Sequence, residues 1–153
     1  YEKIFSLPFN IIRYGSVYAE RDFDNNYIYG LIKEAVNNKE IVHYGDGEEI
    51  REYIHAADAA KLSVDILESE DYKNKHIILT GTQRVKRIEL FNMISEILGH
   101  KVNIKLNNTK STGHYKYTPY SFQPSISKKL IPNPQIDLGQ GLLECIRDVY
   151  QKN

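Results

Sequence analysis

The sequence has one cysteine, no tryptophan, no excess of either charge and no long hydrophobic run. Cys145 stands alone among 153 residues, which excludes an intramolecular disulfide and suits a reducing compartment, so we expect a cytoplasmic protein. No apolar run approaches the roughly 20 residues that span a bilayer, so a membrane is not an expected partner. Basic and acidic residues number 20 each, and this balance gives no reason to expect nucleic acid as a partner.

The sequence also lacks the short motifs that bind a dinucleotide or a metal ion. No Gly-x-x-Gly-x-x-Gly or Gly-x-Gly-x-x-Gly follows a predicted strand, so no glycine turn brings a helix N-terminus to a pyrophosphate. The five histidines show no spacing with acidic residues or cysteine that predicts a metal site. We therefore expect no cofactor-binding, metal-binding or catalytic residue in this chain.

Strand and helix patterns alternate along the chain, which predicts an α/β fold. Residues 8–14 and 76–81 are nearly continuous apolar runs, typical of parallel strands covered on both faces. Residues 41–44 and 101–106 also predict strands, whereas residues 107–124 are polar and irregular. Apolar spacing and capping residues predict helices over 24–38 (capped by Asp24), 58–68 (capped by Asp58), 87–98 and 137–150.

Two segments carry a family resemblance. Residues 7–18, Leu-Pro-Phe-Asn-Ile-Ile-Arg-Tyr-Gly-Ser-Val-Tyr, resemble the strand and turn that open the substrate half of extended short-chain dehydrogenases/reductases. Residues 44–60, Tyr-Gly-Asp-Gly-Glu-Glu-Ile-Arg-Glu-Tyr-Ile-His-Ala-Ala-Asp-Ala-Ala, resemble the aromatic-Gly-Asp-Gly, Arg-acidic-aromatic-Ile-His and Asp-x-Ala signature of that family. The chain is similar to the C-terminal, substrate-binding part of its NAD-dependent nucleotide-sugar epimerases and dehydratases.

The resemblance implies the α/β architecture of the C-terminal half of an extended, Rossmann-like short-chain dehydrogenase. Such a half supplies two edge strands to the parallel sheet and adds a small α/β substrate lobe. Residues 1–153 would then be the substrate-binding part, with the N-terminal NAD-binding Rossmann part absent. The resemblance further implies NAD or NADP as the cofactor of the parent enzyme. The implied partners are a nucleoside-diphosphate sugar, the missing N-terminal half of the same chain and further copies in a homo-oligomer.

The resemblance also implies positions that contact the nucleotide sugar. Asn26 and Tyr27 fall where the family contacts the sugar diphosphate, and Val42 and Tyr44 fall where it receives the base. Arg51 falls where a guanidinium grips the diphosphate. The chemistry of Arg51 supports this role, because a planar fork of donors with a fixed charge suits two adjacent phosphates.

The sequence departs from the family at three places. Ser16 stands where many members have asparagine, so a hydroxyl of shorter reach replaces an amide as a substrate contact. Ala-Glu-Arg at 19–21 replaces a common Gly-Pro-Arg. The later arginine that often completes the diphosphate clamp has no clear match in residues 114–120, where Lys116 or His114 could substitute for it.

Ordinary structural roles remain open for several of these residues. Arg51 could be a solvated charge at a strand end, Tyr44 a packing residue, and Asn26 a helix-start residue bonded to its own backbone. Tyr29 and Lys33 match the Tyr-x-x-x-Lys spacing of the family's catalytic pair. However, the family's pair lies on a helix before the Leu-Pro-Phe strand, so we interpret this match as coincidental.

The leading interpretation is the substrate-recognition portion of an NAD-dependent nucleotide-sugar epimerase or dehydratase. The parent enzyme would oxidise a sugar hydroxyl transiently and then epimerise or dehydrate the sugar. One alternative is a non-catalytic interaction module of the same fold. Another alternative is a reductase of the same family that acts on a nucleotide-linked keto-sugar.

We predict that residues 1–153 alone neither bind NAD nor turn over a nucleotide sugar, because the glycine-rich fingerprint and an upstream Tyr/Lys pair are both missing. Isothermal titration calorimetry with NAD should give no measurable heat of binding. Micromolar binding to this segment would contradict the prediction.

Overall fold

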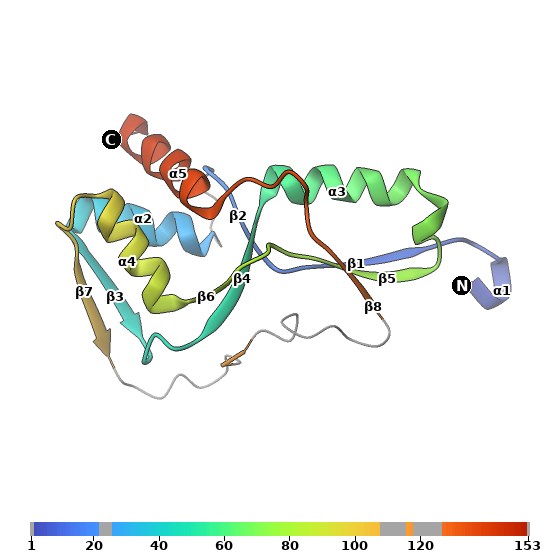
Figure 1. The fold of residues 1–153 in the computed structure, drawn as a ribbon, viewed down its shortest axis with the longest axis horizontal. Coiled ribbons are helices and arrows are strands. Elements are labelled where there is room, and N and C mark those ends of the chain that lie inside the picture. The colour runs from blue at the N-terminus through green and yellow to red at the C-terminus, as the bar shows by residue number, and fades with distance from the viewer. Residues whose placement is uncertain (1, 22–25, 108–115, 118–126, 153) are drawn as a thin grey trace.

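The computed structural model describes residues 2–21, 26–107, 116–117 and 127–152. These residues form a three-stranded sheet covered by one helix, and an adjoining lobe of strands and helices (Figure 1). The helices are α1 (Glu2–Phe5), α2 (Tyr27–Asn38), α3 (Ala56–Glu68), α4 (Arg87–Ile97) and α5 (Leu138–Lys152), with a 3-10 turn η1 at Glu70–Tyr72. The strands are β1 (Asn10–Tyr14), β2 (Ser16–Tyr18), β3 (Glu40–Tyr44), β4 (Ile50–His55), β5 (Lys75–Leu79), β6 (Arg84–Lys86), β7 (Asn103–Asn107) and β8 (Ser127–Leu130).

The three-stranded sheet has the order β1-β5-β8, and all three strands are parallel. Both apolar runs form strands of a parallel sheet, as predicted, and Ile12 of β1 lies opposite Ile77 of β5, so the two strands are neighbours. Helix α3 packs on this sheet and buries Ile66 against Ile77 and Leu79. Strand β8 was not predicted, because its sequence Ser-Lys-Lys-Leu has no apolar run.

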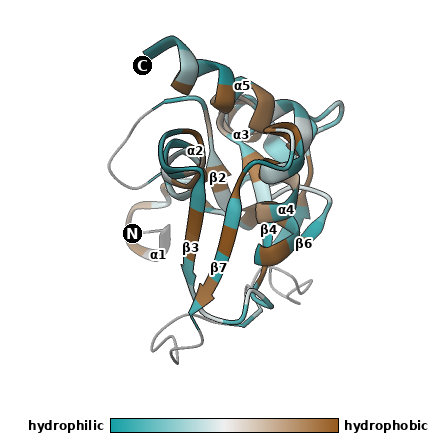
Figure 2. Ribbon diagram, turned by 90° about the vertical axis from the view of Figure 1, so that its left-hand side faces the viewer, coloured by the Kyte–Doolittle hydropathy of each residue, from teal (hydrophilic) through white to brown (hydrophobic). Residues whose placement is uncertain are grey.

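The lobe contains a second parallel pair, β3 and β7, which lie side by side next to α2 and α4 (Figure 2). Ile41 of β3 lies opposite Ile104 of β7, which confirms the two shorter predicted strands. Helices α2, α4 and α5 bury one apolar face each, centred on Ile32, Phe91 and Leu142, which are all fully buried. This second core is separate from the core under α3.

Strand β4 lies between the two cores and belongs to both. It pairs in parallel with β2 and antiparallel with β6. Successive side chains of a strand point to opposite faces. Tyr53 accordingly packs in the core of the lobe, whereas Ile54 packs in the core under α3.

A buried carboxylate on β4 ties the lobe to the three-stranded sheet. Glu52 is only 1% exposed and accepts hydrogen bonds from the Thr80 hydroxyl at 3.0 Å and from the Lys129 ammonium at 2.6 Å. Arg84, on β6, adds a longer contact of 3.4 Å. Because Thr80 follows β5 and Lys129 lies on β8, this one carboxylate fixes β4 against two strands of the sheet.

Two helix starts differ from the prediction. Helix α2 begins at Tyr27 with Asn26 as its N-cap, whereas the predicted cap Asp24 lies outside the described residues. Helix α3 begins at Ala56, because the His55 ring accepts a backbone N–H and caps it one turn earlier than predicted. Asp58, the predicted cap, instead accepts the backbone N–H of Ile136 at 2.8 Å.

Several large apolar side chains stay exposed around the three-stranded sheet. They lie on or beside α1, β1 and α3 and comprise Ile4, Phe5, Leu7, Ile11, Val64 and Leu67. Strands β1 and β8 are the two edges of this sheet. None of the described helices combines the length and the apolar character needed to cross a bilayer.

We predict that residues 1–153 in isolation self-associate or bind hydrophobic dyes. Open sheet edges beside exposed apolar side chains invite pairing with another chain. Light scattering at micromolar concentration, with dye fluorescence measured in parallel, tests this. A monodisperse monomer that binds no dye and unfolds cooperatively would contradict it.

We predict that Glu52→Gln lowers the free energy of unfolding of the natural polypeptide by about 3 kcal/mol, because it leaves the Lys129 ammonium without its buried counter-charge. Urea unfolding measures the change. Glu68→Gln, an exposed position on α3, serves as the control. A loss for Glu52→Gln no larger than the control's, within about 0.5 kcal/mol, would mean that the carboxylate does not hold the two parts together.

Candidate functional site

Arg51 and Tyr27, two of the predicted site residues, lie close to each other in the structure, and Arg87 lies next to them. Arg51 lies on the same face of β4 as Tyr53, opposite the face that carries Glu52. One guanidinium nitrogen of Arg51 donates to the carbonyl of Ile50 at 2.8 Å. The other donors of this side chain stay available for a ligand, since no ion pair of Arg51 occurs among the described residues.

Arg87 is the first residue of α4, and the backbone fixes its place. Its N–H donates to the carbonyl of Glu49 at 3.0 Å, which holds the start of α4 against the residues that lead into β4. The guanidinium carbon lies 3.9 Å from the centre of the Tyr27 ring. This distance is typical of a cation–π contact, so Tyr27 orients Arg87.

The surroundings of these residues favour an anion. Burial, and next the charge of Arg87, lower the pKa of Arg51. One guanidinium nitrogen of Arg87 and the hydroxyl of Tyr53 are buried without a hydrogen-bond partner. Burial raises the pKa of Tyr53 to about 12, although the charge of Arg87 opposes the rise, so this hydroxyl stays a neutral donor near pH 7.

We call Tyr27, Arg51, Tyr53 and Arg87 the double-arginine cluster. It holds two guanidinium groups close enough that, besides burial, the charge of Arg87 lowers the pKa of Arg51, and neither has an ion pair in the described part of the chain. The start of α4 adds the positive end of a helix dipole. Two adjacent phosphates match such a cluster, because each guanidinium offers a fork of donors at fixed charge.

Lys116 lies next to this cluster along the backbone. Its carbonyl accepts the N–H of Ile50 at 2.9 Å, and Tyr117 forms a parallel bridge with Ile50. Lys116 and Tyr117, the described residues of the stretch expected to complete the diphosphate clamp, therefore lie beside the residue that precedes Arg51. The Lys116 side chain is exposed, and His114 lies outside the described residues.

Asn26 has the ordinary structural role that the sequence left open. Its side-chain oxygen accepts the N–H of Tyr29 at 3.2 Å, and its side-chain nitrogen donates to the carbonyls of Ala19 at 2.8 Å and Arg21 at 3.1 Å. The amide thus joins the chain after β2 to the start of α2. Its hydrogen-bonding groups are engaged by backbone, so it positions Tyr27.

Ser16 lies opposite Tyr53 in the β2–β4 register. Paired residues of neighbouring strands carry their side chains on the same face. Ser16 is therefore on the face of the double-arginine cluster, one strand away from Arg51.

Val42 and Tyr44 lie on β3, apart from this face of β4. The N–H of Val42 donates to the Glu34 carboxylate at 3.1 Å, whereas the Tyr44 ring is 64% exposed at the end of the strand. The turn after Tyr44 leads directly to β4, and its Gly47 accepts the N–H of Ile88 at 3.0 Å. This turn links the expected base platform to the start of α4.

The Tyr-x-x-x-Lys spacing at Tyr29 lies inside the lobe. Tyr29 is 1% exposed, and its hydroxyl donates to Asp148 of α5 at 2.6 Å. Burial, and next the bond to Asp148, raise its pKa, which is the opposite of what a catalytic tyrosine needs. This packing agrees with the interpretation that the spacing is coincidental.

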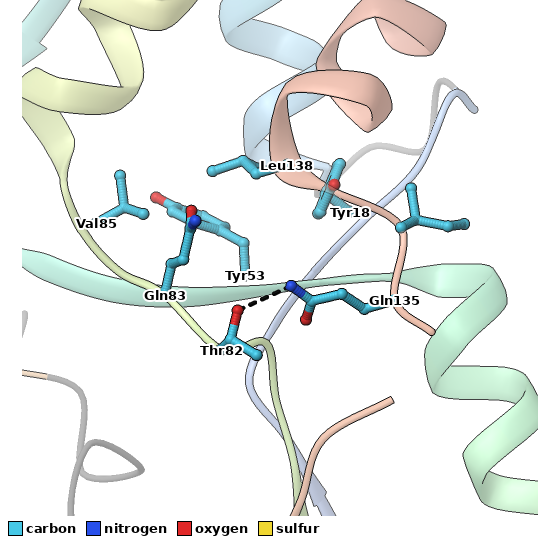
Figure 3. A pocket seen from close by; sticks show the side chains of 8 residues that line it. Tyr18, Tyr53, Thr82, Gln83, Val85, Gln135 and Leu138 are labelled. Carbon is cyan, nitrogen blue, oxygen red and sulfur yellow. Dashed lines mark hydrogen bonds between the residues drawn. The ribbon is translucent and has the colours of Figure 1, made fainter. Parts of the chain in front are cut away.

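A small pocket lies between Tyr53 and α5 (Figure 3). Its volume of about 20 Å³ holds roughly one water molecule, too little for a sugar ring. It is lined by Tyr18, Tyr53, Thr82, Gln83, Val85, Gln135, Ile136 and Leu138. The double-arginine cluster contributes only Tyr53 to this pocket.

Arg87 and Tyr53 were not predicted as site residues from the sequence. One feature of the sequence could have indicated Arg87. A cation in the first turn of a helix interacts unfavourably with the helix dipole, so an arginine at this position suggests a role other than helix stabilisation. Its proximity to Arg51, 36 residues earlier, depends on the antiparallel pairing of β4 with β6 and could not be read from spacing.

The fold matches one class of proteins, the extended short-chain dehydrogenases/reductases. The model of the NAD dependent epimerase/dehydratase family matches residues 1–81, more than half of the chain, and the chain belongs to that family. A dTDP-4-dehydro-6-deoxy-D-allose reductase from Streptomyces sp is 30% identical over 107 residues, which cover 67% of this chain and 32% of the relative. A UDP-N-acetyl-alpha-D-glucosaminuronate decarboxylase from Bacillus cytotoxicus is 25% identical over 92% of this chain and 46% of the relative.

Solved structures confirm the α/β, Rossmann-like fold class. The UDP-glucuronic acid 4-epimerase from Bacillus cereus, in complex with UDP-glucuronic acid and NAD, superposes with a TM-score of 0.80 at 21% identity, over 99% of this chain and 48% of that one. The UDP-N-acetylglucosamine 4-epimerase from Methanobrevibacter ruminantium gives a TM-score of 0.77 at 22% identity, over 99% and 49%. The chain spans 32% of the length of the reductase from Streptomyces sp and 49% of that of a putative UDP-glucose 4-epimerase from Methanocaldococcus jannaschii.

Proposed function

We propose that residues 1–153 are the substrate-recognition part of an NAD-dependent enzyme that epimerises or dehydrates a nucleoside-diphosphate sugar. In this proposal the double-arginine cluster binds the diphosphate, and Tyr44 and the backbone of Val42 receive the base. Lys116 and Ser16 contact the sugar diphosphate from the two sides of Arg51. NAD or NADP would be bound by the other half of the natural polypeptide.

The two arginines carry this proposal. Both lie at one end of β4, without an ion pair in the described residues, and Arg87 has a buried donor without a partner. Buried polar groups are almost always satisfied, so unpaired cationic donors that converge favour an anionic ligand. The relatives support the same ligand class, since their names say that they act on UDP- or dTDP-linked sugars.

We predict that Arg51→Ala and Arg87→Ala each weaken the binding of UDP or dTDP to the natural polypeptide by roughly 1.5–3 kcal/mol, the range for a charge-assisted hydrogen bond. NAD affinity should hardly change. Isothermal titration calorimetry measures both ligands on each variant. Arg147→Ala, which removes an exposed arginine from α5, is the matched control for charge.

Conservative variants separate ligand contact from folding. Arg51→Lys and Arg87→Lys keep the positive charge but lose the planar fork, so each should recover only part of the affinity. Equal losses of UDP and NAD affinity in the alanine variants would instead mean that the arginines support the fold. Unchanged UDP affinity in both would refute the diphosphate role.

A reductase is the second candidate, because the relative from Streptomyces sp that shares 30% identity is named as a keto-sugar reductase. The two reactions differ in their use of cofactor. A reductase consumes one reduced nicotinamide per sugar, whereas an epimerase or dehydratase returns its cofactor to the starting state. The absorbance of the reduced cofactor, followed during turnover by the natural polypeptide, distinguishes the two. It should fall steadily for a reductase and stay constant for an epimerase or dehydratase.

A further inference from the structure

Glu20, His55 and Glu144 converge from three parts of the chain, outside the double-arginine cluster. Glu20 follows β2, His55 ends β4, and Glu144 lies on α5. One ligand atom from each lies within 4.8 Å of the other two. The His55 Nε2 atom is 3.3 Å from a Glu20 carboxylate oxygen and 4.0 Å from a Glu144 carboxylate oxygen.

The polar atoms at this point are poorly satisfied by the protein. The His55 side chain is only 5% exposed, and its Nε2 is buried without a hydrogen-bond partner in the described part of the chain. The Glu20 oxygen that faces it is also buried without a partner. No described lysine or arginine pairs with either carboxylate, so two negative charges and one buried imidazole nitrogen point at the same place.

We propose that Glu20, His55 and Glu144 form a site for one divalent metal ion of the Zn²⁺ type. An imidazole nitrogen and carboxylate oxygens are ligands that Zn²⁺ uses, at about 2.0–2.2 Å. The two carboxylates balance the charge of the ion. The Glu144 side chain is 35% exposed, so water can reach the site from this side and supply the remaining ligands.

The hydrogen bond at His55 Nδ1 determines which ring nitrogen carries the proton, and this bears on which metal ions the site prefers. Its Nδ1 accepts the N–H of Ala57 at 3.3 Å, so the neutral ring carries its proton on Nε2. A metal ion that binds Nε2 displaces the proton there, the neutral ring then carries its proton on Nδ1, and the long bond from Ala57 is lost. Only an ion with strong affinity for imidazole offsets this loss, which favours Zn²⁺ over Mg²⁺.

The fold holds the imidazole in place for this role. The Tyr18 ring packs edge-on against the His55 ring, with 5.3 Å between centroids and an interplanar angle of 86°. Gly141 makes room for Tyr18, because a Cβ there would overlap the Tyr18 hydroxyl. Glu144 lies one turn further along α5, on the same side of the helix. A bound ion would therefore join α5 and the chain after β2 to the end of β4.

The test uses the natural polypeptide without a polyhistidine tag, freed of metal by a chelator. Isothermal titration calorimetry with Zn²⁺ should give one equivalent per chain, with no comparable binding of Mg²⁺. His55→Asn, Glu20→Gln and Glu144→Gln should each weaken Zn²⁺ binding more than about tenfold. Glu96→Gln, an exposed glutamate on α4, should leave it unchanged.

The variants separate loss of a ligand from loss of the fold. Asparagine at position 55 keeps an acceptor for the cap of α3, and Glu20 is half-exposed, so both variants should melt near the natural protein when metal is absent. Zn²⁺ should raise the melting temperature of the natural sequence and not of Glu20→Gln. Zn²⁺ affinity that is equal in the natural sequence and all three variants, or no Zn²⁺ binding at all, would overturn the proposal.

Discussion

The buried carboxylate of Glu52 is the interaction on which the arrangement of this molecule depends. It joins β4 to residues at the ends of β5 and β8, and it does so from the middle of the strand that both cores share. The close approach also needs Gly81, since a Cβ there would overlap the carbonyl of Tyr53. With one face of β4 held in this way, the alternation of the strand turns Arg51 and Tyr53 toward the lobe.

The two candidate sites follow from that orientation, because both are built on the same face of β4. Arg51 lies near one end of β4, close to Arg87 of α4. His55 lies at the other end of β4, close to Glu20 and Glu144. Within the described part of the chain, the first site gathers two guanidinium groups that have no ion pair, and the second gathers two carboxylates and an imidazole with no paired lysine or arginine. One strand thus presents two sites of opposite charge to the elements of the lobe.

The sequence predicted much of the fold, because the elements that make it have strong local patterns. The apolar runs that became β1 and β5, and the helical spacing that became α2 and α4, depend on residues within one element. Strand β8 was missed because Ser-Lys-Lys-Leu is polar, and its place is set by Lys129 bonding to Glu52 across 77 residues. Arg51 was predicted as part of a site from its motif. Its neighbour Arg87 and the cluster around His55 were not, because strand pairing and helix packing bring them together.

The central claim is that β4 turns Arg51 toward Arg87 so that the pair grips a diphosphate. A crystal structure of the natural polypeptide with bound UDP tests it most directly. We expect diphosphate oxygens within about 3 Å of guanidinium nitrogens of both Arg51 and Arg87. A diphosphate that contacts neither arginine, while Arg87 still lies on Tyr27 and Arg51 still bonds to the carbonyl of Ile50, would contradict the claim.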